Sequence, residues 1–202
     1  MVDNAAVNAI GYNTLDNFLY GRHTGSEQLI RISADGTATP IGPLTNGGNN
    51  GDIDTDGYYW YSAGGATWNQ VDLRPDSATY GQLIDSGTAT TIGAVPDWAY
   101  IPSAGRYMYT VLPSSDGAST IFGRFSLDTK SWEAVGTYPA IARNNWGPMY
   151  PDNNGTLYAT DSDSGQIWAF PVAGGRPSLV SRGPAAGEPS DDGARCVLNV
   201  DL

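Results

Sequence analysis

The chain has 202 residues, which is enough for one domain with a sizeable core, and two domains are not expected. Ten Lys and Arg stand against 21 Asp and Glu, and the resulting net charge of −11 argues against nucleic acid or an anionic membrane as a partner. Only 15% of the residues are charged, while Gly, Asn, Ser, Thr, Tyr and Trp are plentiful, a balance that suits short strands joined by tight turns.

The amino-acid composition indicates where the protein is located. Lys130 is the only lysine, and this lysine-poor style, rich in Asn, Thr, Ser and Gly, is typical of secreted proteins. We therefore expect the protein to be secreted or exposed on the cell surface. No window approaches the 18 apolar residues of a membrane span, so no membrane insertion is expected. The single cysteine, Cys196, excludes an internal disulfide framework.

The first unit, about residues 7–45, is predicted to contain four short strands. They are expected at residues 8–12, 18–21, 28–32 and 37–41. Asp35-Gly36 separates the last two of these runs, and this dipeptide is a strong hairpin signal because both residues tolerate a positive φ. No stretch of the chain shows a convincing helical period, so the prediction is all-β.

The following units repeat this plan over about residues 50–90, 95–138 and 143–183. Their strands are expected at residues 52–54, 58–61, 68–73 and 80–84, then 97–101, 107–111, 121–127 and 132–135, then 145–150, 156–159, 166–170 and 178–180. The second strand of each unit is rich in aromatic or large apolar residues. The chain is therefore predicted to form a single repetitive domain.

Each unit opens on an Asn or Asp residue. The five leading residues are spaced by 44, 45, 48 and 47 positions and are Asn8, Asp52, Asp97, Asn145 and Asp192. A period in this range with about four strands per period is the signature of a β-propeller. We predict about five blades, four complete and the fifth represented mainly by its inner strand in a partial unit, 190–202. A partner chain or a missing N-terminal segment is expected to complete this fifth blade.

Several of these runs also resemble a known family. They include Asn-Ala-Ile-Gly-Tyr-Asn at residues 8–13, Leu-Ile-Arg-Ile-Ser-Ala-Asp-Gly at 29–36, Trp-Asn-Gln-Val-Asp-Leu at 68–73 and Asp-Gly-Ala-Arg-Cys at 192–196. Over residues 7–197 the chain is similar to the DUF6923 family of uncharacterised extracellular domains from fungal and bacterial surface proteins. The resemblance implies a propeller-like fold. Members usually carry roughly one more half-unit before Asn8, and the family brings no established activity or catalytic residues.

The leading residues allow two interpretations. Around a propeller axis they would form a ring of amide and carboxylate groups at one mouth of the channel, and such a ring could bind a polar ligand or a cation. Alternatively, each side chain could accept hydrogen bonds from backbone amides of a neighbouring blade. The ligand-binding candidates are Asn8, Asp52, Asp97, Asn145 and Asp192, although the structural interpretation is favoured.

One run resembles half of a calcium loop. Asp52, Asp54 and Asp56 precede Gly57 in the pattern D-x-D-x-D-G, and these three are the candidate metal ligands. The Glu that completes such a loop is replaced by Ala63, and Asp-Gly also makes a hairpin turn. The cofactor expectation is therefore none, with calcium as the alternative.

Catalytic motifs are lacking. His23 is the only histidine and is predicted to lie in a surface loop, and there is no G-x-S-x-G elbow. Most of the six tryptophans are expected in the core, although one exposed aromatic ring could stack on a sugar. Cys196 is either a buried thiol or the partner of a cysteine in a longer parent chain.

The prediction is a non-enzymatic binding or adhesion module whose partner is a glycan or a surface protein. One alternative is a carboxylate-dependent polysaccharide hydrolase or lyase at the channel mouth, using Asp52, Asp97 or Asp192. Another is a structural or assembly domain. The ligand, the oligomeric state and any activity stay open at this point.

Overall fold

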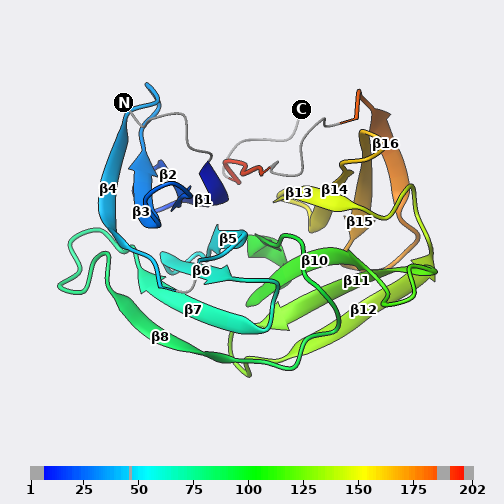
Figure 1. Ribbon diagram of the computed structural model, residues 1–202, viewed down its shortest axis with the longest axis horizontal. Coiled ribbons are helices and arrows are strands. Elements are labelled where there is room, and N and C mark those ends of the chain that lie inside the picture. Colours follow the sequence, from blue (N-terminus) through cyan, green and yellow to red (C-terminus); the bar gives the residue numbers. More distant parts are fainter. Residues whose placement is uncertain (1–6, 46, 186–191, 198–202) are drawn as a thin grey trace.

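The structure is a computed structural model that describes residues 7–45, 47–185 and 192–197. In these residues, sixteen strands form four antiparallel sheets of four strands each. The sheets stand around a common axis as the blades of a propeller (Figure 1). The all-β propeller predicted from the repeat is therefore confirmed.

Each blade uses consecutive strands, which follow one another in sequence order across the sheet. Blade 1 contains β1 (Val7–Asn13), β2 (Phe18–His23), β3 (Gln28–Ile32) and β4 (Ala38–Pro43); blade 2 contains β5 (Asn50–Ile53), β6 (Tyr58–Ser62), β7 (Thr67–Asp72) and β8 (Leu83–Thr88). Blade 3 contains β9 (Ala99–Tyr100), β10 (Tyr107–Pro113), β11 (Ser119–Ser126) and β12 (Trp132–Pro139), with a short 3₁₀ turn at Pro102–Ala104; blade 4 contains β13 (Trp146–Pro151), β14 (Thr156–Asp161), β15 (Gln166–Pro171) and β16 (Ser178–Arg182). The first strand of each blade lies nearest the axis and the fourth lies outermost (Figure 1).

The count of about five blades is wrong, because the described chain has four. Residues 192–197 lie between β1 and β13 (red in Figure 1) but form no strand. A strand is defined by its ladder of hydrogen bonds, and no strand of the described residues pairs with this segment. The other residues of the predicted partial unit, 190–191 and 198–202, lie outside the described residues.

The outer strand of blade 2 begins later than predicted. The sequence placed it at residues 80–84, whereas β8 spans Leu83–Thr88. Residues before it form a turn, in which the Tyr80 amide donates to the Ser77 carbonyl (3.1 Å) and the Gln82 amide donates to the Thr79 carbonyl (2.9 Å). The apolar residues at 80–84 therefore divide between a turn and a strand.

The core consists of three hydrophobic clusters, one at each junction between consecutive blades. Tyr20 and Leu29 of blade 1 pack with Tyr59, Tyr61 and Val71 of blade 2. Between blades 2 and 3 the buried residues are Trp60, Trp68, Trp98, Tyr100, Met108, Phe125 and Leu127. Between blades 3 and 4 they include Tyr109, Val111, Phe122, Trp146, Met149, Leu157, Ala159 and Phe170. Burial of these aromatic and aliphatic side chains is the main stabilising contribution.

The outer strands carry exposed apolar side chains. Leu83, Ile84, Val135 and Val180, four of the exposed large apolar side chains, lie on β8, β12 and β16, where the sheets meet water. Among the described residues, no helix is long and apolar enough to cross a membrane.

Candidate functional site

The leading Asp residues join neighbouring blades. The Asp52 carboxylate accepts a hydrogen bond from its own following amide, Ile53 (2.8 Å), through Oδ1. Its Oδ2 accepts from the backbone amide of Tyr100 in blade 3 (2.7 Å). Both bonds satisfy amides at the inner end of a blade, which would otherwise be buried without a partner.

Asp97 repeats this arrangement one blade further on. Its Oδ1 accepts from the Trp98 amide (2.8 Å), and its Oδ2 accepts from the amide of Met149 in blade 4 (2.9 Å). Asp97 is only 4% exposed, so these bonds are shielded from water. The Asp of one blade thus holds the inner strand of the next blade.

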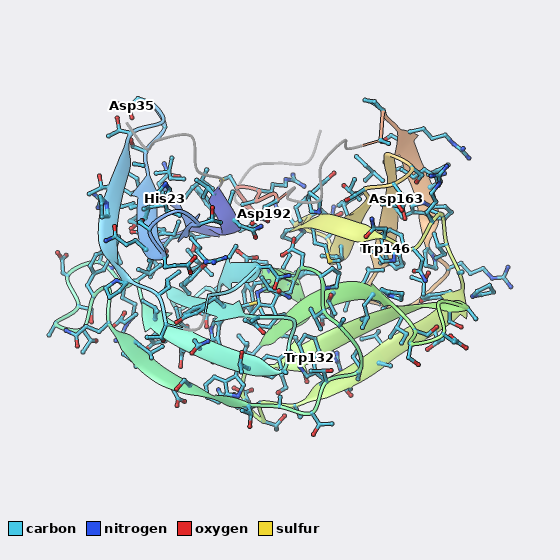
Figure 2. All side chains as sticks on the ribbon, viewed as in Figure 1. His23, Asp35, Trp132, Trp146, Asp163 and Asp192 are labelled. Carbon is cyan, nitrogen blue, oxygen red and sulfur yellow. The ribbon has the colours of Figure 1, made fainter. Side chains whose placement is uncertain are left out.

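Asp192, labelled beside blade 1 in Figure 2, makes the same pair of contacts. Its Oδ1 accepts from the Gly193 amide (2.7 Å) and its Oδ2 from the Ile10 amide of β1 (2.8 Å). Residues 192–197 therefore contact the first blade even though they form no strand.

The two leading Asn residues behave differently. Asn8 Oδ1 accepts from the amide of Ala9 (2.7 Å), whereas Asn145 Nδ2 donates to the Asp163 carboxylate (2.9 Å) in the turn between β14 and β15. Among the five predicted ligand-binding residues, the three Asp residues make the contact from blade to blade.

Burial alters the protonation of the ring. It raises the pKa of Asp52 and of Asp192 to about 7, and it raises the pKa of Asp97 as well. Repulsion from Asp192 adds to the rise at Asp97, while the amide hydrogen bonds act in the opposite direction. Near neutral pH the carboxyls of Asp52 and Asp192 are therefore partly protonated.

The axial cavity beside this ring is narrow. Its lining includes Asp52, Tyr12, Tyr100, Met149 and Arg195, and its volume is about 10 Å³. A cavity of that size holds about one water molecule. Asp52 is the ring residue in this lining, and the cavity has no room for a sugar ring. Whether the ring residues bind a ligand stays a prediction.

The candidate calcium ligands are not brought together. Asp54 Oδ1 accepts from the amides of Asp56 and Tyr58 (both 3.0 Å), and its Oδ2 accepts from Trp60 Nε1 (2.9 Å). Asp56 instead pairs with Arg106, and Asp52 belongs to the ring. Within the described residues, no three His, Cys, Asp or Glu side chains gather as a metal site. The D-x-D-G run works here as a hairpin turn closed by Asp54.

Two other predicted placements can be compared with the structure. His23, expected in a surface loop, is the last residue of β2 and is 7% exposed, with its Nδ1 2.7 Å from Ser26 Oγ. The surface assignment was wrong because the strand extends two residues beyond Gly21. Cys196 is a half-buried free thiol, and its pairing with a cysteine of a longer parent chain stays a prediction.

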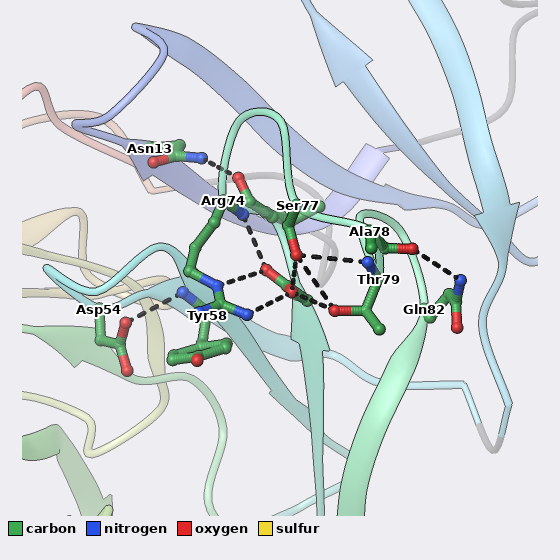
Figure 3. Close-up of polar contacts among 10 residues, drawn as sticks. Asn13, Asp54, Tyr58, Arg74, Ser77, Ala78, Thr79 and Gln82 are labelled. Carbon is green, nitrogen blue, oxygen red and sulfur yellow. Dashed lines mark hydrogen bonds and ion pairs between the residues drawn. The ribbon is translucent and has the colours of Figure 1, made fainter.

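Sequence analysis missed a buried carboxylate in blade 2. Asp72 is fully buried and accepts from Arg74 Nε (2.9 Å) and Nη2 (2.7 Å), Ser77 Oγ (2.6 Å) and Thr79 Oγ1 (2.5 Å). Figure 3 draws the polar contacts of the labelled Arg74, Ser77 and Thr79. The Arg74 guanidinium beside it holds the pKa of Asp72 well below its usual range. The sequence signal that could have revealed this network is the run of polar residues that follows strand β7. Since every oxygen is engaged inside the turn, Asp72 is a structural residue.

An open groove lies at the outer rim between blades 3 and 4. It has a volume of about 440 Å³ and is lined by Thr137, Tyr138, Pro139, Ile141, Trp168, Arg176 and Pro177. Both aromatic rings are half-buried. The Tyr138 hydroxyl donates to the Gly175 carbonyl (3.2 Å), and Trp168 Nε1 donates to Gln166 Oε1 (2.9 Å), so both rings have fixed orientations. No sequence signal joined these residues, because they come from different blades.

The family of the chain follows from its repeats. The model of a repeat of unknown function, DUF6923, matches residues 3–198. The chain belongs to the DUF6923 repeat family. A search of curated proteins finds no match.

Several solved propellers are similar in fold. A streptogramin B lyase shares 15% identity at a TM-score of 0.54, covering 88% of this chain and 55% of that one. A gluconolactonase from Xanthomonas campestris shares 14% identity at a TM-score of 0.58, and the match covers 88% of this chain and 61% of that one. A chain of a nidogen/laminin complex shares 12% identity at a TM-score of 0.58, and the match covers 87% of this chain and 64% of that one. The chain thus spans less than two thirds of each of these structures. At such identities the likeness shows the fold alone.

Proposed function

We propose that the protein is a non-enzymatic binding module, secreted or displayed on the cell surface, and that it binds a glycan in the groove between blades 3 and 4. The observation that carries this proposal is the pair of half-buried rings, Tyr138 and Trp168, in an open groove of about 440 Å³. Pockets of several hundred Å³ with aromatic walls and a few polar groups are typical of small-ligand sites.

The chemistry of the groove fits a sugar. The face of an aromatic ring packs on the apolar C–H face of a pyranose, while Arg176 and Thr137 can hydrogen-bond its hydroxyl groups. The hydrogen bonds of Tyr138 and Trp168 fix both rings before a ligand arrives. Such preorganisation reduces the entropy lost on binding. Arg176 also supplies a cation, which favours glycans that carry an acidic group.

The hydrolase or lyase alternative has less support. Its candidate acids, Asp52, Asp97 and Asp192, each accept hydrogen bonds from two backbone amides, and the cavity that Asp52 lines has a volume of only about 10 Å³. A glycosidase needs two carboxyls facing a space that admits the sugar. The raised pKa values at the ring follow from burial, which is the ordinary consequence of an interior position.

The proposed location rests on composition, since a single lysine among ten cations and a surface rich in Asn, Ser and Thr suit a secreted protein. It can be checked by fractionating the source cells and probing each fraction for the chain. Recovery in the cytosol alone would contradict it.

Binding is tested with a glycan array followed by titration calorimetry of each glycan that binds. Tyr138→Ala and Arg176→Ala are expected to weaken binding by about tenfold or more, because each removes a direct contact. Val135→Ser is the matched control, since Val135 lies on the same strand, is 37% exposed and does not line the groove. An array without binding, or binding that both substitutions leave unchanged, would overturn the proposal.

A further inference from the structure

Three arginines are unpaired among the described residues, and all three follow β12 in the chain. They are exposed to solvent and are Arg143, Arg176 and Arg182. The arginines of blades 1 to 3 engage a partner instead: Arg22, Arg74, Arg106 and Arg124 pair with carboxylates, and Arg31 stacks on the ring of Phe18. The free guanidinium groups therefore belong to blade 4 and to the segment that leads into it.

Arg176 stands at one end of the groove between blades 3 and 4. It lines this groove together with Tyr138 and Trp168, and among the described lining residues it is the one that carries a charge. The Tyr138 hydroxyl donates to the Gly175 carbonyl (3.2 Å), which holds the turn before Arg176 against blade 3. The aromatic surface of the groove therefore ends on a free cation.

Arg182 lies at the other end of the same face of blade 4. On β15 the side chains of Gln166 and Trp168 emerge on one face, since successive residues of a strand alternate, and Trp168 Nε1 donates to Gln166 Oε1 (2.9 Å). Arg182 of β16 lies opposite Gln166, so its side chain emerges on this face too. Between Ser178 and Arg182 the strand advances about 13 Å.

Arg143 reaches the same end of blade 4 from the connection between β12 and β13. Its backbone amide donates to Asp161 Oδ2 (3.2 Å), and Asp161 lies opposite Gln166 on β15. Ile141, two residues earlier, still lines the groove. The backbone thus carries Arg143 from the groove to the end at which Arg182 lies.

Few exposed acids balance these three cations. From residue 137 to residue 182 the acids are Asp152, Asp161 and Asp163. Asp152 and Asp161 are buried and accept backbone amides, which leaves Asp163 as the exposed carboxylate. Glu133 of β12 is paired with Arg124. In a chain of net charge −11, this face is therefore locally positive, whereas the acidic remainder of the surface repels anions.

We propose that the ligand of the groove is an acidic oligosaccharide, whose carboxylate or sulfate groups bind Arg176 at one end and Arg182 and Arg143 at the other, while its sugar rings lie on Tyr138 and Trp168. This inference rests on the proposed function and specifies the class of glycan. The planar guanidinium group presents paired N–H donors that match an anionic oxygen pair. Because the cations lie further apart than one sugar ring extends, the ligand is a chain of sugars.

The test compares an acidic glycan with its own neutral form. An array of uronic-acid, sulfated and neutral glycans is followed by titration calorimetry of the tightest acidic ligand and of its methyl ester or desulfated derivative, which distinguishes carboxylate from sulfate. We expect the acidic form to bind about tenfold more tightly than the neutral form. Raising NaCl from about 50 mM to about 300 mM should weaken binding of the acidic form by about tenfold, because salt screens exposed charges.

Arg182→Gln removes one cation without changing a described lining residue of the groove. It is expected to weaken binding of the acidic glycan by about fivefold and binding of the neutral form by less than about twofold. Arg143→Gln should act in the same direction. Arg31→Gln is the matched control, since it removes the same charge from blade 1 and should leave the affinity for both forms unchanged.

The outcomes separate this inference from the proposed function on which it rests. Equal affinities for the acidic and neutral forms, or an affinity that both Arg182→Gln and Arg143→Gln leave unchanged, would overturn the inference, and the glycan site would stand if Tyr138→Ala still weakened binding. Acidic glycans that bind Tyr138→Ala as well as the unchanged chain would overturn both, as would an array without binding. Single-stranded DNA that binds as tightly as the acidic glycan would overturn the assignment to sugars.

Discussion

The Asp192 carboxylate accepts a hydrogen bond from the backbone amide of Ile10, 182 positions earlier in the chain, at 2.8 Å. Asp52 and Asp97 make the equivalent bond to the next blade. The same side chain at the same point of the repeat thus links blades 2 and 3, blades 3 and 4, and the last described segment and blade 1. In this propeller, which has few charged residues, carboxylates near the axis connect neighbouring segments by hydrogen bonds.

Removing one of these connecting carboxylates should destabilise the fold. Asp192→Ala leaves the amides of Ile10 and Gly193 without acceptors, and because these donors are only partly buried, their loss of a partner costs about 1 kcal/mol. We expect the free energy of unfolding, measured by urea denaturation, to fall by about that amount. Asp163→Ala is the control, because Asp163 is exposed and receives a single side-chain bond. Equal losses in the two variants would contradict the role of Asp192.

Stability should fall as the pH rises through neutrality. The pKa of Asp52 and Asp192 is about 7 in the folded chain against an ordinary 3.8, so the folded state binds these protons more tightly than the unfolded state does. Their contribution is fully present below about pH 4 and is lost by about pH 7. We expect the free energy of unfolding to decrease by about 2 kcal/mol or more between pH 5 and pH 8 at constant ionic strength.

The double variant Asp52→Asn with Asp192→Asn provides the control for this pH dependence. It removes the titrating groups of Asp52 and Asp192 and leaves that of Asp97, while keeping one oxygen acceptor at each substituted place. Its free energy of unfolding should change much less over the same range. A wild-type stability that rises from pH 5 to pH 8 would show that the amide hydrogen bonds, which favour the charged carboxylates, outweigh burial.

The Asp72 network should be more sensitive to mutation than other carboxylates of blade 2. Asp72→Ala leaves the donors of Arg74, Ser77 and Thr79 without their shared acceptor and frees the turn that leads into β8. Breaking such a buried charged network costs about 3 kcal/mol. Asp85→Ala on exposed β8 is the matched control and should change stability by less than about 0.5 kcal/mol. Thermal unfolding of the two variants checks the difference.

The sequence predicted the local features well. Strand β3 was placed residue for residue, because Gln28 to Ile32 is bounded by turn residues and is apolar where the sheet is buried. The leading Asp residues were visible as a period, but which amide each would bind is set by the neighbouring blade, 48 or more positions away. Non-local pairing of that kind leaves no trace in a single sequence.

The same limit explains the missed features. The groove joins Tyr138 of blade 3 to Trp168 of blade 4, and neither residue is unusual in its own strand. His23 was assigned to the surface from the polar residues around it, whereas its place is decided by the strands β1 and β3, where Val7 and Gln28 lie opposite it. Burial depended on those neighbours and not on the loop that follows.

The close approach of blades 1 and 2 offers a last test of the inner ring. A Cβ added at Gly11 of β1 would lie 2.8 Å from Asp52 Cα and 2.9 Å from Asp52 Oδ1, distances at which the backbone of β5 must move. Gly11→Ala is therefore expected to lower the free energy of unfolding by about 2 kcal/mol. Gly42→Ala, in the outer strand of the same blade, meets its nearest atom at 3.5 Å and should be nearly neutral. Since both substitutions add the same methyl group, equal stabilities would show that the ring tolerates an extra carbon and that Asp52 does not fix the spacing of these two blades.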